Sequence, residues 1–90
     1  MKRIKVLISG KVQGVSFRTF IKHMAVSLNL KGYVKNLSSG EVEAIFQGED
    51  KAIKEIINNC KKGTLASKVI DIKITEESNK SEFNGFEIRY

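Results

Sequence analysis

The chain has 90 residues, of which 41% are hydrophobic, and its formal net charge is +6 at pH 7. That length leaves no room for a second domain, so we expect one domain over residues 1–90. The charge favours an anionic partner without distinguishing nucleic acid, a lipid surface and a phosphorylated metabolite, although the scattering of the 16 Lys and Arg residues weakens the case for a polymer.

The first half of the sequence predicts a strand, a helix and a hairpin. Apolar residues alternate over 4–8, which is typical of a strand with one buried face. Helical spacing of apolar side chains then predicts a helix over 16–30, ended by Gly32. Residues 33–37 and 41–47 follow as the two strands of a β-hairpin, joined by a short polar turn.

The second half predicts a helix and two strands. The helix begins at 48–50, where two carboxylates suit its positive end, and ends at Gly63. A strand over 68–75 follows, then a polar loop over 76–82 and a short terminal strand over 86–90. The first of these strands is predicted to place three isoleucines on one face: Ile70, Ile72 and Ile74.

This order, β-α-β-β-α-β with an extra C-terminal strand, indicates an α+β fold. Two helices that each bury one stripe, beside strands that alternate, imply a two-layer α/β sandwich. We therefore predict the ferredoxin-like fold, an antiparallel sheet with two helices on one face. That fold hosts many unrelated functions, so function must be argued from the site.

The segment 10–18 connects the first predicted strand to the first helix. Gly10 and Gly14 permit backbone conformations that turn successive N–H groups toward one concave side, and the positive end of the helix adds to that field. Arg18, in the first helical turn, can donate two N–H bonds to phosphate oxygens. The segment lacks the Gly-Lys-Ser/Thr of a Walker A loop. It is a candidate phosphate site, and a glycine turn followed by a surface arginine is the alternative.

Asn36 is an uncharged polar residue late in the second predicted strand. An asparagine in this position commonly bonds its own turn, but its carboxamide can also orient a water molecule. The first and second strands of the predicted fold run in the same direction and end at the same edge of the sheet. Asn36 can therefore face the loop that follows the first strand.

The two segments together resemble the paired signature of the acylphosphatase family, small enzymes that hydrolyse carboxyl-phosphate anhydrides. Residues 12–18 are similar to the phosphate loop of the family, and residues 32–36 with Gly40 are similar to its second motif. The ending 85–90 is similar to its C-terminal strand. Many members carry Trp where this chain has Tyr33, an exchange that a packing role tolerates.

The resemblance implies a metal-independent acylphosphatase without a cofactor, in which Arg18 binds the substrate phosphate and Asn36 holds the attacking water. Inorganic phosphate is then both product and inhibitor. The leaving carboxylate, with a solution pKa of about 4, departs without a general acid, and a loose phosphoryl transition state needs mainly positioning and charge neutralisation. The residues implied to bind the phosphate are Gln13, Gly14, Val15, Ser16, Phe17 and Arg18.

Other reactive residue types have no predicted chemistry. His23 has no partner ligand nearby in the sequence. The single cysteine, Cys60, lies on the apolar stripe of the second helix, excludes an internal disulfide, and fits a reducing compartment. Glu41 and Glu43 are expected on a solvated strand face.

Two alternatives to an enzyme are an RNA-binding module and an accessory domain without catalysis. RNA-recognition modules share the predicted fold, but Lys35 stands where they need a stacking aromatic. No apolar run approaches the ~20 residues of a membrane span, and the apolar part of the N-terminus is too short for a signal peptide. We therefore expect a cytoplasmic monomer that binds neither nucleic acid nor membrane.

Overall fold

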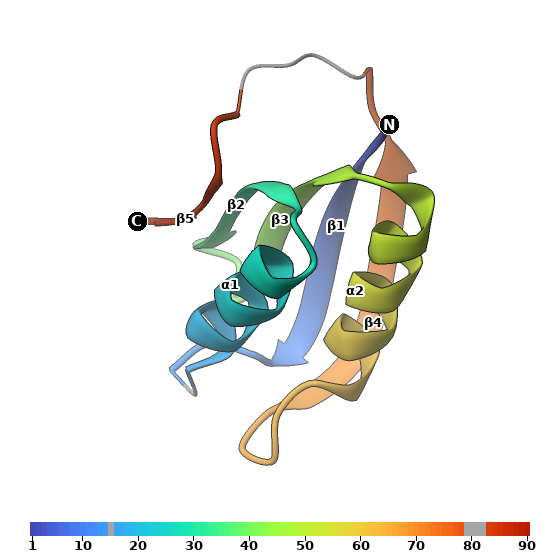
Figure 1. Ribbon diagram of the computed structural model, residues 1–90. Helices are drawn as coiled ribbons and strands as arrows, with labels where there is room; N and C mark the ends of the chain where they lie inside the picture. Colours follow the sequence, from blue (N-terminus) through green and yellow to red (C-terminus); the bar gives the residue numbers. More distant parts are fainter. Residues whose placement is uncertain (15, 79–82) are drawn as a thin grey trace.

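The computed structural model describes residues 1–14, 16–78 and 83–90. Both helices cover one face of a single sheet (Figure 1). The predictions that concern Val15 and residues 79–82 of the polar loop lie outside the described residues. The elements are β1 (Lys2–Lys11), α1 (Phe17–Ser27), β2 (Lys31–Asn36), β3 (Val42–Gly48), α2 (Asp50–Lys62), β4 (Lys68–Glu76) and β5 (Phe86–Arg89).

The strand order in the sheet is β4-β1-β3-β2-β5. The first four strands of that order pair antiparallel, as predicted, and the ferredoxin-like α+β fold is confirmed. β5 adds beside β2 in parallel, with Phe86 opposite Gly32, so the sheet is mixed. Because β1 and β2 both run antiparallel to β3, the strands β1, β2 and β5 all end at the same edge of the sheet.

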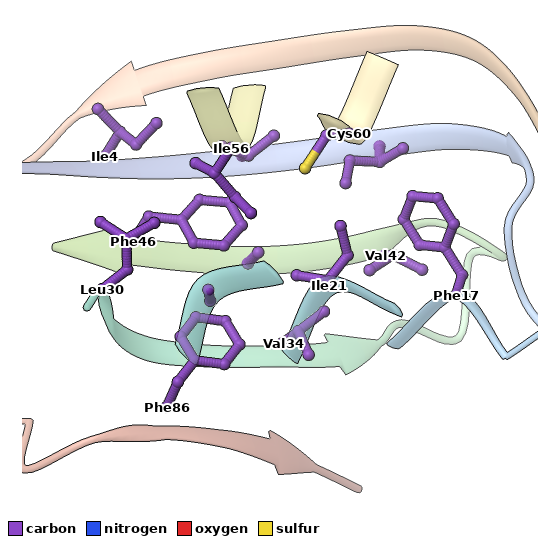
Figure 2. Packing of buried hydrophobic residues seen from close by; sticks show 14 of the residues in the cluster. Ile4, Phe17, Ile21, Leu30, Val34, Val42, Phe46, Ile56, Cys60 and Phe86 are labelled. Carbon is purple, nitrogen blue, oxygen red and sulfur yellow. The ribbon is translucent and has the colours of Figure 1, made fainter. Parts of the chain in front are cut away.

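The core lies between the sheet and the two helices (Figure 2). The rings of Phe46 on β3 and Phe86 on β5 stack with centroids 5.6 Å apart. Cys60 of α2 is fully buried there, as predicted, and burial raises the pKa of its thiol to about 12. The other fully buried large side chains include Ile4, Ile8, Phe17, Ile21, Ile53 and Ile56.

The first helix is shorter than predicted, and Gly32 does not end it. α1 ends at Ser27, and Asn29 adopts a left-handed conformation at φ 58° while the Leu30 N–H donates to the Ala25 carbonyl at 2.9 Å. This backbone arrangement is a common helix C-terminus. Gly32 lies inside β2, where an added Cβ would stand 1.9 Å from the Ile45 carbonyl oxygen, so its glycine is required by the close approach of β3.

The predicted isoleucine face of β4 is interrupted by a β-bulge. Ile72 pairs with Ile8 and packs against the core, but Val69, and not Ile70, pairs with Gly10. The extra residue turns Ile70 outward, where it is 73% exposed. The alternation of residue types does not predict this shift in register, because a bulge leaves no signal in that alternation.

Candidate active site

A cavity of about 310 Å³ lies at the sheet edge where β1, β2 and β5 end. The structure brings Arg18 and Asn36 to one cavity, as the sequence predicted, although they are 18 positions apart in the chain. We call this hollow the anion cavity. Its walls are formed by Val12, Gly14, Ser16, Phe17, Arg18, Thr19, Asn36, Ile88 and Tyr90.

The loop that enters the first helix has an unusual backbone. Gly14 lies at φ 73°, and Ser16, the N-cap of α1, lies in the left-handed region at φ 59°. A non-glycine residue pays about 1–2 kcal/mol for that conformation, and such strain tends to persist at functional sites. The first helical hydrogen bond runs from the Phe20 N–H to the Ser16 carbonyl at 3.1 Å. The main-chain N–H groups of residues 17–19 therefore have no helical acceptor.

These N–H groups make the start of α1 suitable for an anion. The first turn of the helix contains no acidic residue, and the Ser16 side chain makes no capping hydrogen bond. The positive end of the helix dipole is thus not neutralised by the helix itself. A phosphate oxygen bound there would accept hydrogen bonds from donors that have no acceptor within the helix.

Arg18 is half-buried and is held against the C-terminal strand. Its Nη1 donates to the Arg89 carbonyl oxygen at 3.4 Å, and its Cζ lies 4.8 Å from the centre of the Tyr90 ring. These two contacts orient the guanidinium along the wall of the anion cavity. A guanidinium has five N–H donors, so donors are available for a bidentate contact with phosphate.

Asn36 is the last residue of β2, and its side chain is half-buried in the wall of the anion cavity. Its Oδ1 is buried and accepts no hydrogen bond from the residues that the structure describes. The turn that follows is closed by other groups: the Leu37 N–H donates to the Glu41 carbonyl at 2.8 Å, and the Gly40 N–H donates to the Leu37 carbonyl at 3.1 Å. The Asn36 Oδ1 is therefore not used to build the turn.

Gln13 does not line the anion cavity, and its side chain has a role that the sequence analysis missed. Its Nε2 donates to the carbonyl oxygens of Leu37 at 2.8 Å and Glu41 at 2.9 Å. These bonds attach the loop between β1 and α1 to the hairpin turn that follows Asn36. Only the main-chain N–H of Gln13 is left for the predicted phosphate contact. Leu37 and Glu41 lie 24 and 28 positions after Gln13, and no pattern in the sequence indicates a bond over such a separation.

Glu41 also differs from its prediction as a solvated side chain. It is half-buried, and it accepts hydrogen bonds from the Ser9 hydroxyl at 3.1 Å and from the Ser39 hydroxyl at 3.0 Å. One carboxylate thus connects the end of β1 to the β2–β3 turn. Together with Gln13, it fixes the position of Asn36 relative to the loop between β1 and α1.

Tyr33 and Glu43 pack on the sheet face away from the helices. Glu43 is only 8% exposed, which corrects its prediction as solvated. The Tyr33 hydroxyl donates to the Glu43 Oε2 at 2.8 Å. The Lys5 Nζ lies 3.4 Å from the Glu43 Oε1, and the Lys35 Nζ lies 3.7 Å from the Oε2. Burial raises the Tyr33 pKa to about 12. Burial alone would raise the Glu43 pKa, but the hydrogen bonds and lysines outweigh it and lower that pKa. The Arg89 Cζ lies 4.1 Å from the centre of the Tyr33 ring, so a face of that ring is occupied.

Within residues 1–14, 16–78 and 83–90, no three His, Cys, Asp or Glu side chains group so as to hold a metal ion. His23 is exposed on α1. Over the same described ranges, neither helix is long and apolar enough to cross a bilayer.

Known proteins resemble the chain over its whole length. The Acylphosphatase family model matches residues 4–88. The acylphosphatase of Methanocella arvoryzae is 42% identical over 89 residues, which cover 99% of this chain and 100% of that protein. The crystal structure of acylphosphatase from Bacillus subtilis matches with a TM-score of 0.96 and 36% identity, covering 100% of both chains.

A domain of a larger protein is also similar. The crystal structure of full-length HypF in the phosphate- and nucleotide-bound form matches with a TM-score of 0.83 and 36% identity, covering 99% of this chain but 12% of HypF. The full-length matches to the two free-standing acylphosphatases confirm the enzyme prediction. On sequence and fold together, this chain belongs to the acylphosphatase family.

Proposed function

We propose that Arg18 and the N–H groups of the phosphate loop bind the phosphate of an acyl phosphate, and that Asn36 orients the water that attacks phosphorus. The observation that carries this proposal is the shared cavity: Arg18, Asn36 and the unneutralised start of α1 line one hollow. The predicted loop positions Gly14, Ser16 and Phe17 belong to the same wall. Val15 lies outside the described residues.

The reaction needs few groups from the protein. The water oxygen forms a bond to phosphorus while the bond between phosphorus and the bridging oxygen breaks. The carboxylate leaves with the bonding electron pair, and both water protons end on the phosphate, so that an acyl phosphate dianion and water give a carboxylate and dihydrogen phosphate. A substrate phosphate oxygen accepts the proton of the attacking water.

The two side chains have separate tasks in this scheme. Arg18 neutralises charge on the equatorial phosphate oxygens and fixes the phosphate by a planar fork. Asn36 Oδ1 accepts a hydrogen bond from the water and directs its oxygen to phosphorus. The carboxylate leaves without protonation because its acid is strong, with a pKa of about 4. The chemistry therefore calls for neither a general acid nor a metal.

We further propose a monomer that acts on a small molecule in the cytoplasm, without a nucleic-acid partner. Arg18 and Asn36 line one cavity within a single chain, so the proposed site does not require a second copy. Arg89 occupies a face of the Tyr33 ring, on which an RNA base would have to stack. The cytoplasmic location rests on the single cysteine, which fits a reducing compartment.

Release of inorganic phosphate from acetyl phosphate, measured with a chelator present, tests the proposal. We expect turnover by the wild-type chain and none from a stable phosphate monoester, whose leaving group requires protonation. Arg18→Ala serves as the inactive control. Absence of turnover by the folded protein, or turnover that appears only when Mg²⁺ is restored, would contradict the proposed mechanism.

A further inference from the structure

A second hollow adjoins the anion cavity and is not used by the chemistry described above. Its volume is about 530 Å³, and apolar atoms form most of its surface. We call it the apolar groove. Ser16 and Thr19 line both hollows, so the groove begins where the anion cavity ends. The walls of the groove are Ser16, Thr19, Phe20, His23, Thr64, Leu65 and Ala66.

The groove lies on the side of the phosphate loop away from Asn36. Asn36 ends β2, whereas residues 64–66 lead into β4, and in the sheet β2 and β4 lie on opposite sides of the β1–β3 pair. Accordingly, Asn36 lines the anion cavity only, and residues 64–66 line the groove only. Figure 1 shows the loop before β4 and the loop before α1 at the same end of the molecule.

This placement matters because phosphoryl transfer is an in-line displacement. The attacking and leaving oxygens lie on opposite sides of phosphorus. If Asn36 directs water from the β2 side, the acyl group departs on the side that faces away from β2. The apolar groove opens in that direction.

The walls of the groove are held in place by the fold. The Thr64 N–H donates to the Ser67 hydroxyl at 2.7 Å, and the Ser67 N–H donates to the Thr64 carbonyl at 3.1 Å, which fixes the turn that carries Leu65. Phe20, which also lines the groove, is half-buried and packs on Phe17 with ring centroids 6.1 Å apart. Leu65 itself is fully exposed. One exposed leucine is ordinary, but here it lines, together with Phe20, a shallow hollow that shares Ser16 and Thr19 with the anion cavity.

We propose that the apolar groove binds the apolar substituent of the acyl group, so that the enzyme prefers longer alkanoyl phosphates to acetyl phosphate. This inference rests on the proposed function, since it requires phosphate to occupy the anion cavity. An acetyl group is too short to extend past Ser16 and Thr19. A longer chain covers Phe20 and Leu65 and removes their apolar surface from water.

Comparison of acetyl phosphate with hexanoyl phosphate tests the proposal. The two leaving groups have nearly the same acidity, so a difference in kcat/KM reports binding of the chain and not chemical reactivity. In the wild-type protein we expect kcat/KM for hexanoyl phosphate to be higher by about 10-fold, because one methylene in an apolar pocket already gives about that discrimination.

Leu65→Ser removes one wall of the groove at an exposed position, where folding is not at risk. We expect the hexanoyl-to-acetyl ratio of kcat/KM to fall by about 3-fold or more. Ile70→Ser is the matched control, since Ile70 is also a large exposed aliphatic residue near the start of β4 but does not line the groove. That variant should keep the wild-type ratio.

Phe20→Ala tests the groove at a second lining residue. We expect a loss of the ratio at least as large as that of Leu65→Ser, measured below the thermal midpoint of the variant, because a ratio of two substrates cancels any loss of folded protein. Equal kcat/KM values for the two substrates, or a ratio that Leu65→Ser and Phe20→Ala leave unchanged, would overturn the inference while the proposed function stands. No turnover of either substrate by the wild-type protein would overturn the proposed function itself.

Discussion

The two strand-to-helix junctions of this fold are built in opposite ways. At the second junction, β3 leads directly into α2, the N-cap Glu49 has an extended backbone at φ −67°, and Asp50 stands in the first turn. At the first junction, a loop separates β1 from α1, the N-cap Ser16 is left-handed, and the first turn has no acidic residue. Arg18 adds a positive charge there, at the positive end of the helix.

The second junction has the features that stabilise a helix, whereas the first junction lacks them and has features suited to binding an anion. A carboxylate at a helix N-terminus contributes about 0.3–1 kcal/mol, whereas a left-handed non-glycine residue costs about 1–2 kcal/mol. The start of α2 is therefore favourable by itself. The start of α1 is unfavourable by itself, and a bound anion would stabilise it, as the proposed function requires. Changes at the two junctions should consequently have different effects, and the following experiments measure them.

The largest effect is expected at Arg18. Arg18→Ala removes the bidentate donor of the first junction and should lower kcat/KM for acetyl phosphate by at least ~10³-fold. Arg18→Lys should also fail, because an ammonium cannot reproduce the planar fork. Steady-state phosphate release checks both variants, with circular dichroism to establish folding. If Arg18→Lys kept most of the wild-type kcat/KM, the bidentate role would be wrong.

The second effect concerns Asn36, which faces the first junction from β2. Asn36→Ala should lower kcat by ~10²-fold, as for other positioned polar groups. It should leave phosphate affinity within a few-fold of wild type, because in the proposed mechanism Asn36 contacts the water and not the phosphate. Asn36→Asp should lower both kcat and the phosphate affinity, since a carboxylate repels the incoming dianion. Inhibition by inorganic phosphate measures the affinities. An unfolded Asn36→Ala variant would instead assign the residue to the structure of the turn.

The sequence analysis places Arg18 and Asn36 at one edge of the sheet for a physical reason, and both residues line one cavity. Alternation and helical spacing predict the strands and helices, and the topology then places the ends of the first two strands at one edge, so Arg18 and Asn36 meet. The same reasoning fails for Gln13, whose side-chain bonds to the β2–β3 turn depend on a loop conformation without any period. It also fails at Ile70, where a bulge shifts the register, and at β5, whose parallel pairing with β2 is not encoded in its own alternation.

A carboxylate introduced at the start of α1 should make the first junction resemble the second. Thr19→Asp places an acid in the first turn of α1, at an exposed position that lines the anion cavity. We expect a more stable protein, by up to ~1 kcal/mol, and a phosphate affinity at least ~10-fold lower, because the like charges repel. Lys51→Asp, in the first turn of α2, is the control and should leave the phosphate affinity within a few-fold. Unchanged phosphate binding by Thr19→Asp would mean that the anion does not lie at the start of α1.

Inorganic phosphate should itself stabilise the folded protein. A ligand that binds only the folded state adds RT ln(1 + [L]/Kd), which is about 1.4 kcal/mol at ten times Kd. The thermal midpoint should rise with phosphate and should not rise with sodium chloride of equal ionic strength. The rise should be absent in Arg18→Ala. A midpoint that responds equally to both salts would indicate screening of surface charge and no specific site.

The smallest effect is expected at the second junction. Asp50→Asn removes the carboxylate from the first turn of α2 and should lower the free energy of unfolding by about 0.3–1 kcal/mol, since the interaction is with the helix dipole at an exposed position. Urea denaturation at low ionic strength measures the loss, and 1 M salt should reduce it because the Debye length falls to about 3 Å. Phosphate inhibition and kcat/KM should keep their wild-type values, because α2 begins at the opposite end of the sheet from the anion cavity: β3 runs antiparallel to β1 and β2. If Asp50→Asn changed the phosphate affinity and not the stability, the start of α2 would belong to the anion site, contrary to the assignment made here.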